Sequence, residues 1–463
     1  MSAFGPVTTA LAEYVGDRTA RAPEAALDLA ATAVLDTVGV ALAAAAEPAV
    51  TRLLEALGGG NGTSTVLVDG SRTDARQAAL LNGTAAHALD FDDVDDLLTG
   101  HPSTVLVPVV LAVGEQVGAT GDQVADAYWR GLTTMRTLAA GLGLADHYAR
   151  GWHSTATLGV LGAAAAAASL LSLAPGEIGH ALGIAVSRAA GTRQNFGSMT
   201  KPLHAGVAAA DGVLAAQLAA GGFTADPEAL EGRYGFLRLY SGRVGEQDVR
   251  AATDRVRGVL ASPGPALLNV KLYPCCYATN APADAVLDLV AAGLGADEVA
   301  SVMVGVPPGG LGPLIDHPAR SGLEGKFSVE YVAAACLFDG ALRLGSFTDA
   351  AVARPRVAEL ASRVTADESL PMAGSADGLE FRAAVTVRTR DGRELSARCE
   401  APRGHASNPA KATDLRRKFD DCATSGGFRG ADALHTALSG LRGARSVADA
   451  LLPLSAVGAR TDP

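Results

Sequence analysis

Aromatic residues are scarce in this sequence, at 5% of 463 residues, whereas alanine is abundant and glycine numbers 54. Apolar residues make up 48% and charged residues 19%, a balance typical of a globular chain rather than a disordered one. Because few rings are available to fill a core, we expect helices that pack closely through Ala and Gly.

Positive charge is also in short supply. The chain has 38 Lys and Arg against 49 Asp and Glu, a net charge of −11, with a pI near 5.3. This balance excludes a nucleic-acid partner, which requires a basic surface. An acidic protein that binds an anion must concentrate its cations locally, so Arg193, Lys201 and Lys271 stand out within the polar motifs described below.

Cysteines are few and irregularly spaced. The five, at 275, 276, 336, 399 and 422, form no spaced ladder, and adjacent cysteines rarely bridge each other. We therefore expect free thiols in the cytoplasm. The N-terminus has no charged segment followed by an apolar one, so no signal peptide is expected.

Motifs for several large enzyme classes are missing. There is no GxxxxGK[ST], no GxGxxG after a strand, no HExxH and no GxSxG, which leaves nucleotide, dinucleotide, zinc-peptidase and serine-hydrolase functions without support. Residues 155–174 carry no charge and are long enough to cross a bilayer. They are mostly Ala, Gly, Ser and Thr, however, so we predict a buried core helix and no membrane association.

The first part of the chain is predicted to be almost entirely helical. Apolar residues recur at three- and four-residue spacing, and Gly, Pro or Asp interrupts the pattern between segments. One exception, residues 63–70, is typical of a short strand that ends in a turn. The predicted helices span residues 24–46, 74–89, 104–118, 121–142, 155–173, 176–190 and 203–220.

The pattern changes near Ser262-Pro-Gly-Pro265. Beyond it, strand-like segments 299–306, 379–389 and 394–400 alternate with helical segments 279–293, 328–340 and 348–361, and Arg390-Asp-Gly-Arg393 predicts a hairpin turn. Helical patterns return at 412–422, 431–441 and 447–452. The prediction is a mainly α protein: a large all-helical domain built from both chain ends (1–263 and 404–463), with a smaller α+β domain (264–403) inserted.

Acidic residues and histidines gather between these helices. The run around Asp90 is a solvated helix end, a cation site, or a carboxylate that orients His101; it lacks the Gly and distal Glu of a calcium loop. His101 and His153 each precede a helix start, where Ser103 or Thr104, and Ser154 or Thr155, would cap the helix. Imidazoles placed there are ordinary structural residues, or they act as acid, base or anion binder.

Arg193 to His204 is a glycine-containing loop that enters a helix. Backbone N–H groups at such a helix start bind carboxylates or phosphates, and Lys201 adds a full charge, so we favour function over a simple helix entry. Lys271-Leu-Tyr-Pro-Cys-Cys276 also enters a helix. Its cysteines are nucleophiles, metal ligands or, most commonly, small buried residues. No further metal ligands accompany them, and Tyr331 is by default a core tyrosine.

These motifs together resemble the MmgE/PrpD family, over residues 5–425. The resemblance rests on Asn82-Gly-Thr-Ala-Ala-His-Ala-Leu-Asp-Phe-Asp-Asp93, Gly151-Trp-His-Ser-Thr155, Thr200-Lys-Pro-Leu-His-Ala-Gly206, Lys271 to Cys276, and Asn408-Pro with Lys418-Phe. The family includes 2-methylcitrate dehydratase, cis-aconitate decarboxylase and iminodisuccinate epimerase. It implies that the α+β domain is a lid, that the protein is a homodimer, and that no metal or other cofactor takes part.

The resemblance also implies which residues form the site. The family's catalytic positions fall on Asp90, His101, His153, Lys201 and Tyr331, with Lys271 as a cation of the lid. We add Arg193, Lys271, His204 and Cys276 as residues that contact the substrate. A histidine stands at the Cys276 position in the decarboxylase members, many members have His where this chain has Asn280, and Val94 replaces a hydroxyl residue of the decarboxylase.

These departures weigh against decarboxylation. The predicted function is a cofactor-independent lyase, a 2-methylcitrate dehydratase-like enzyme that removes a proton next to a carboxylate of a small hydroxy acid. Lys201, Lys271 and Arg193 would hold the carboxylates while a histidine moves the proton. The alternatives are an epimerase or decarboxylase of a similar acid, and a non-catalytic carboxylate-binding or scaffold protein.

Overall fold

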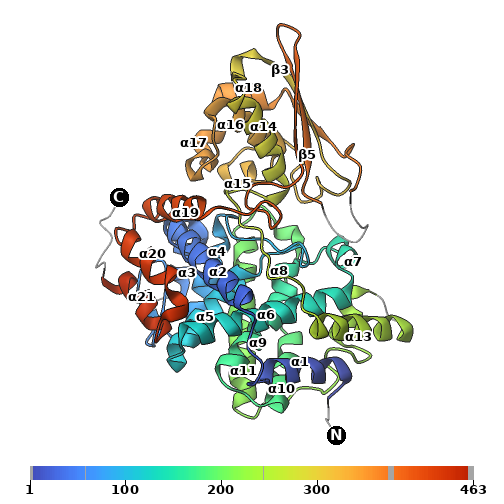
Figure 1. Cartoon of the computed structure of the whole chain (residues 1–463), viewed down its shortest axis with the longest axis vertical. Coiled ribbons are helices and arrows are strands. Elements are labelled where there is room, and N and C mark those ends of the chain that lie inside the picture. Colours follow the sequence, from blue (N-terminus) through green and yellow to red (C-terminus); the bar gives the residue numbers. More distant parts are fainter. Residues whose placement is uncertain (1–3, 58, 243–244, 374–379, 457–463) are drawn as a thin grey trace. The chain divides into compact units, whose positions relative to one another are not determined.

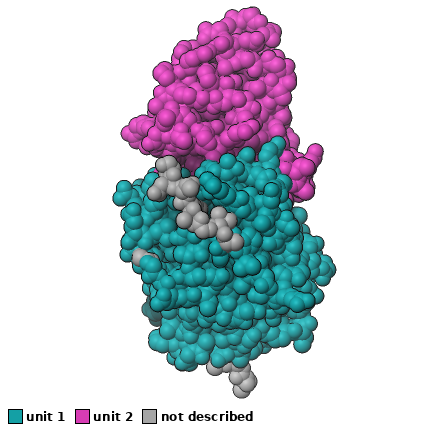
Figure 2. Space-filling model, turned by 90° about the vertical axis from the view of Figure 1, so that its left-hand side faces the viewer, with its two compact units in different colours: residues 1–88, 92–268, 416–463 teal, residues 89–91, 269–415 magenta. Residues whose placement is uncertain are grey.

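The chain divides into two compact units (Figure 2). The computed structural model describes residues 4–57, 59–242, 245–373 and 380–456. Unit 1 comprises residues 1–88, 92–268 and 416–463, and unit 2 comprises residues 89–91 and 269–415. Sequence patterns gave no indication that the three-residue segment 89–91 groups with unit 2.

Unit 1 is helical, and most of its helices lie where the apolar periodicity predicts them (Figure 1). The helix predicted at 121–142 has those bounds. The one predicted at 155–173 is interrupted at Leu158, and α1, α3, α7, α12 and α13 were not predicted. The helices are α1 Pro6–Gly16, α2 Glu24–Ala43, α3 Pro48–Leu57, α4 Ala75–Ala88, α5 Ser103–Val117, α6 Gly121–Leu142, α7 Leu144–Ala149, α8 Ser154–Thr157, α9 Gly159–Leu170, α10 Pro175–Val186, α11 Thr200–Ala220, α12 Phe236–Ser241, α13 Glu246–Ala261, α19 Ala412–Ser425 (in unit 1 from residue 416), α20 Ala431–Ser439 and α21 Val447–Ala456.

The strand predicted at 63–70 is wrong beyond its first residues. Only β1, Ser64–Thr65, forms, paired antiparallel with β2, Arg72–Thr73. Asn82 of α4 explains the difference, because its side chain accepts a hydrogen bond from Leu67 N and donates one to Thr65 O, both at 2.8 Å. A side chain thus takes the backbone groups that a longer strand would have used.

Helices α4 and α11 approach each other through glycines. A Cβ atom added at Gly206 would lie 2.3 Å from both Leu80 O and Thr84 Oγ1, and one at Gly83 would lie 2.9 Å from Gly206 Cα. The expected close packing through small residues is therefore confirmed at this contact. It matters for the site because α4 ends near His87 and α11 begins near Lys201.

Within the described part of the chain, two helical segments are long and apolar enough to cross a membrane by length and composition, Glu24–Ala46 and Thr200–Ala220. In each, 67% of the most apolar stretch is buried. The charge-free segment at 155–174 contains α9, whose residues 159–169 are all buried. The prediction of a buried core helix there is confirmed.

Unit 2 contains a four-stranded sheet in the order β4-β3-β5-β6, with helices α14, α16 and α18 on one face (Figure 1). β3 and β4 are parallel and the other pairs antiparallel. The predicted hairpin at 390–393 is confirmed, since β5 and β6 pair directly on either side of it. The strands are β3 Val299–Gly305, β4 Val364–Asp367, β5 Ala383–Thr389 and β6 Glu394–Cys399; the helices are α14 Asn280–Ala291, α15 Gly322–Gly325, α16 Val329–Asp339, α17 Asp349–Val352 and α18 Pro355–Ala361.

β4 was not predicted, because its four residues directly follow a helical pattern and are too few to show an alternation of their own. Residue 379, the first of the strand predicted at 379–389, lies outside the described residues, and β5 begins only at Ala383. In the structure, the chain passes from unit 1 to unit 2 near residue 268 and returns to unit 1 near residue 415. The predicted domain boundaries fall near residues 263 and 403.

Candidate active site

Four of the nine histidines form one cluster in unit 1. His87 ends α4, His101 precedes α5, His153 precedes α8 and His204 lies in the second turn of α11. Ring centroids are 4.7 Å apart for His87 and His101, 5.8 Å for His87 and His153, and 5.4 Å for His153 and His204. Three of the four were predicted as site residues; His87 was not.

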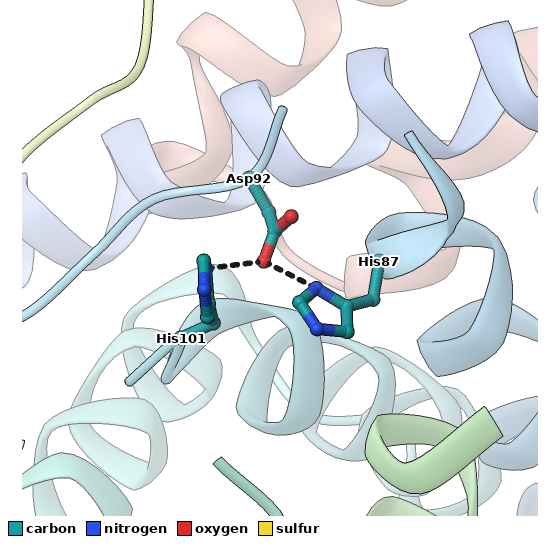
Figure 3. Close-up of side chains that lie close together, drawn as sticks. All are labelled: His87, Asp92 and His101. Carbon is teal, nitrogen blue, oxygen red and sulfur yellow. Dashed lines mark hydrogen bonds and ion pairs between the residues drawn. The ribbon is translucent and has the colours of Figure 1, made fainter. Parts of the chain in front are cut away.

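A single carboxylate oxygen lies between two of these rings. His87 Nδ1 is 2.9 Å and His101 Nδ1 is 3.0 Å from Oδ2 of Asp92 (Figure 3). Burial would raise the pKa of Asp92, but the contacts with His87 and His101 outweigh it and hold that pKa well below its usual range. The carboxylate that bonds His101 is therefore Asp92, two residues after the Asp90 that sequence reasoning selected.

The second half of the cluster pairs His153 with His204. Their Nδ1 atoms are 3.1 Å apart, so one ring donates its proton and the other accepts. Burial lowers the pKa of His153 well below its usual value, and His87 and Lys201 lower it further. Burial, His87 and Lys201 likewise lower the pKa of His204 to about 4. Both rings are neutral near pH 7 and able to accept a proton.

Hydrogen bonds between loops bring the two halves together. Ser154 Oγ donates to Thr99 O at 2.6 Å, and His101 N donates to Thr155 Oγ1 at 3.1 Å. The predicted caps are thus wrong, since neither Ser154 nor Thr155 caps α8. Likewise neither Ser103 nor Thr104 caps α5; the carboxylate of Asp93 accepts from Ser103 N instead. These side chains fix the histidine loops rather than the helix ends.

Lys201 is a buried cation beside the imidazoles. Its Nζ lies 5.3 Å from the centre of the Phe196 ring, and the same ring packs edge-on against His153 at 5.0 Å. Thr200 N and Lys201 N are bonded to Ser198, so these backbone groups of α11 are already used. The side chain of Lys201, more than the helix start, supplies positive charge to the site.

Arg193 lies on the same loop but is stacked on an aromatic ring. Its guanidinium carbon is 3.6 Å from the centre of the Tyr148 ring, and Nη1 donates to Tyr148 O at 2.9 Å. The backbone N–H of Arg193 donates to Gly151 O at 2.8 Å, next to the His153 turn. Arg193 therefore holds the loops of the cluster together, whatever it does for a substrate.

The remaining predicted residues belong to unit 2. Asp90 has a left-handed backbone conformation, with φ of 52°, and both its carbonyl oxygen, at 2.9 Å, and its carboxylate accept from Lys271 Nζ. Lys271 is fully buried. Because its ammonium group grips the Asp90 backbone and side chain at once, it holds a conformation that non-glycine residues adopt rarely.

Cys276 and Tyr331 are buried in unit 2. Cys276 N donates to Lys326 O at 2.9 Å, and the Tyr331 hydroxyl donates to Ser346 O. Burial raises the pKa of Tyr331. Asn280, which stands where many relatives were expected to have a histidine, donates from Nδ2 to Cys276 O at 3.0 Å and so closes its own helix entry.

Lys326 was missed by sequence reasoning. Its buried Nζ donates to Leu89 O at 2.6 Å and to Pro274 O at 3.0 Å, so it holds the carbonyl just before Asp90. Its rarity was the available signal, since the chain has only five lysines. His87 and Asp92 were visible in the motif 82–93 but carried no separate sign of their roles.

Among the described residues, one group of His, Cys, Asp and Glu side chains is close enough for a metal ion: His87, Asp92 and His101, with ligand atoms within 4.8 Å. Both imidazoles use the nitrogen that faces Asp92, so an ion there would have to displace two hydrogen bonds. A cavity of about 620 Å³ elsewhere in unit 1 is lined by Arg18, Arg21, Asp122 and others, and includes no predicted site residue.

Family profiles and related proteins match this chain over most of its length. The profile of the MmgE/PrpD N-terminal domain matches residues 9–247, and that of the C-terminal domain matches residues 273–434. Cis-aconitate decarboxylases from Homo sapiens and Mus musculus are each 31% identical, over 74% of this chain and 71% and 70% of their own lengths. The enzyme of that name from Aspergillus terreus is 27% identical over 74% of each chain.

Proposed function

Because this chain belongs to the MmgE/PrpD family, we propose that it is a cofactor-independent lyase that acts on a small di- or tricarboxylic acid. The observation that carries the proposal is the buried cluster of four imidazoles beside Lys201 in unit 1. Such a set suits proton transfer at a carbon next to a carboxylate, where a neutral base and a fixed cation are both needed.

His153 and His101 are the proposed proton-transfer groups. His153 is neutral near pH 7, so it acts first as an acceptor. His101 carries its proton on Nδ1, since that atom faces the Asp92 carboxylate and also lies 2.9 Å from the carbonyl oxygen of Asp93. Its Nε2 atom is then the one that exchanges protons. Lys201 is proposed to bind a substrate carboxylate, with His204 and Arg193 as further contacts.

Asp90, Lys271, Cys276 and Tyr331, which belong to unit 2, are proposed as further catalytic or substrate-binding residues, and the resemblance implies that unit 2 is a lid. The ammonium group of Lys271 holds Asp90 in its conformation. A contact between Lys271 and the substrate would therefore use the same ammonium group. Tyr331 can act as a proton donor only if its hydroxyl leaves Ser346 O. These assignments rest on the family resemblance.

Two reactions are candidates. The named relatives favour decarboxylation of cis-aconitate, in which the bond to one carboxylate breaks, CO₂ leaves, and the electron pair left on carbon takes a proton from the enzyme. Cys276, Asn280 and Val94 favour dehydration of a 2-methylcitrate-like hydroxy acid. There a base removes the proton next to the carboxylate, and hydroxide leaves with a proton from a second group. Epimerisation of iminodisuccinate would use the same proton removal.

Proton NMR in D₂O with cis-aconitate, citrate, 2-methylcitrate and iminodisuccinate tests the proposal. A decarboxylase consumes cis-aconitate and gives an unsaturated acid with one carboxylate fewer, whereas a dehydratase consumes citrate or 2-methylcitrate and gives an unsaturated acid that keeps every carboxylate. Proton loss without a new product indicates an epimerase. Absence of any reaction, with binding of the same acids measured by calorimetry, would support the non-catalytic carboxylate-binding alternative instead.

His153→Ala should lower turnover of the accepted substrate by about 10²–10⁴-fold, the usual loss for a general acid or base. His317→Ala is the control, because His317 is exposed on unit 2. Lys201→Ala should raise KM as well as lower kcat. A His153→Ala protein that keeps near-full turnover would contradict the assignment.

A homodimer and a cytoplasmic location are further proposals. The five cysteines are buried free thiols, which supports a reducing compartment. Light scattering on the purified chain tests the dimer, since a mass near 46.6 kDa would indicate a monomer.

A further inference from the structure

His87 is a buried imidazole that uses only one of its nitrogens. Its side chain is fully buried, and Nδ1 lies 2.9 Å from Asp92 Oδ2. Its Nε2 atom has no hydrogen-bond partner among the described residues. Since a carboxylate oxygen only accepts, Nδ1 carries the proton. A half-satisfied buried imidazole costs stability, and the Asp92 contact is the one hydrogen bond of this ring among the described residues.

That contact is shared with the proposed catalytic histidine. The oxygen that accepts from His87 also forms an ion-pair contact with His101 Nδ1, at 3.0 Å, and Figure 3 shows both contacts converging on it. His101 Nδ1 also lies 2.9 Å from the carbonyl oxygen of Asp93. The other oxygen of Asp92 is buried and has no partner among the described residues. The negative charge of one carboxylate oxygen is therefore shared between two imidazoles.

We infer that His87 is a positioning residue that acts on His101 through Asp92. By donating to the shared oxygen, it draws off part of the carboxylate's charge and so limits how strongly Asp92 stabilises a protonated His101. This inference rests on the proposed function, in which His101 exchanges a proton. Without His87, the carboxylate would interact with His101 alone, and His101 would become more basic.

The surroundings of His87 keep it neutral while His101 works. Burial lowers the pKa of His87 to about 4; Asp92 opposes this in part, and Lys201 and His101 add to it. His87 thus donates from Nδ1 without titrating near neutral pH. The charged and titratable groups that face His87 or the Asp92 carboxylate come from α2, the loop after α4, the loops before α5 and α8, and α11. They are Asp36, Asp92, Asp93, His101, His153, Lys201 and His204.

The test compares two substitutions of His87. His87→Asn places an amide nitrogen near the position of Nδ1 and keeps the donor, whereas His87→Leu removes it at similar volume. In the Leu variant, we expect the pKa of His101, measured by ¹H–¹⁵N NMR of its ring, to rise by about one pH unit. The acid limb of the kcat/KM profile should move up by the same amount. The Asn variant should retain both values. His147→Asn, a buried histidine bonded to Thr157 and Tyr240 O, is the matched control.

The outcomes separate this inference from a structural role. An equal rise in both variants, or a loss of rate at every pH with the His101 pKa unchanged, would overturn it. If the Leu variant does not fold, His87→Gln takes its place, because its amide lies too far along the side chain to reach Asp92 and should give the same rise. The NMR titration needs no turnover, so failure of the proposed reaction leaves this test standing.

Discussion

The five lysines of this chain are distributed in an unusual way, since four of them are buried: Lys201, Lys271, Lys326 and Lys418. Lysine is rarely buried unless it is paired or functional. Lys271 bonds Asp90, Lys326 bonds two carbonyl oxygens, Lys418 pairs with Asp36, and Lys201 lies at the imidazoles. Lys411 is the exposed one, and most surface positive charge comes from arginine, so the four buried lysines mark interior positions where a cation has a structural or functional role.

The neighbouring carboxyl groups of Asp92 and Asp93 differ in protonation state. Asp92 accepts from two imidazoles and stays ionised. Asp93 faces Ser103 and the Tyr128 network instead, and burial raises its pKa to about 8, with Asp36 and Asp92 adding to the rise. Asp93 is therefore protonated in the folded protein near pH 7, although it is adjacent in sequence to an ionised carboxylate.

Asp93→Asn should make stability less dependent on pH. Between about pH 4 and 8 the folded chain keeps a proton that the unfolded chain has lost, so wild-type stability falls as pH rises, by up to about 1.4 kcal/mol per pH unit. Asn has no proton to lose. We expect urea unfolding at pH 5 and pH 8 to show that the free energy of unfolding of the variant, relative to that of the wild type, is higher at pH 8 than at pH 5. A difference that is constant with pH would mean that Asp93 is ionised when folded.

At the scale of elements, glycine pairs decide which helices touch. The contact of α4 with α11 depends on Gly83 and Gly206, where no side chain fits between backbones. α6 and α9 meet in the same way, since a Cβ on Gly131 would lie 2.9 Å from Gly162 O. Few aromatic residues are needed in such a core because the helix axes come close enough for small side chains to fill it.

Gly206→Ala should destabilise the protein by about 1–3 kcal/mol or more, because the new methyl group would overlap Leu80 O and Thr84 Oγ1. Gly258→Ala, in α13, meets nothing within 4 Å and should instead stabilise by about 0.5–1 kcal/mol. Thermal denaturation of both variants tests this. Equal midpoints would show that α4 and α11 can separate without cost.

At the scale of the whole molecule, distant parts of the chain meet within unit 1. Lys418 of α19 pairs with Asp36 of α2, 382 positions away in sequence, with Nζ 2.7 Å from Oδ1. Arg442 bonds Glu24, Asp28 and Asp122. Asp36 also raises the pKa of Asp93, so the buried ion pair made by the C-terminal segment lies close enough to act on the acidic residues of the candidate site.

Lys418→Met should cost about 3–5 kcal/mol, because it leaves Asp36 buried without its partner. Lys418→Met combined with Asp36→Leu should recover most of that loss, and Lys411→Met, on an exposed lysine, should change little. The midpoint of urea denaturation measures all three. A double variant no more stable than Lys418→Met alone would show that the loss does not come from an unpaired charge.

The sequence by itself determined the mainly helical character, most helix positions, the β5–β6 hairpin, and the concentration of histidines with Lys201 at helix starts. Those features follow from local rules, namely apolar periodicity, turn residues and motif spacing. Only the tertiary structure decided that Asp92 rather than Asp90 bonds His101, that His87 shares its oxygen, and that Asp36 pairs with Lys418. Such contacts depend on how helix surfaces fit together, as at Gly83 and Gly206, and periodicity shows which face of a helix is buried but not what it meets.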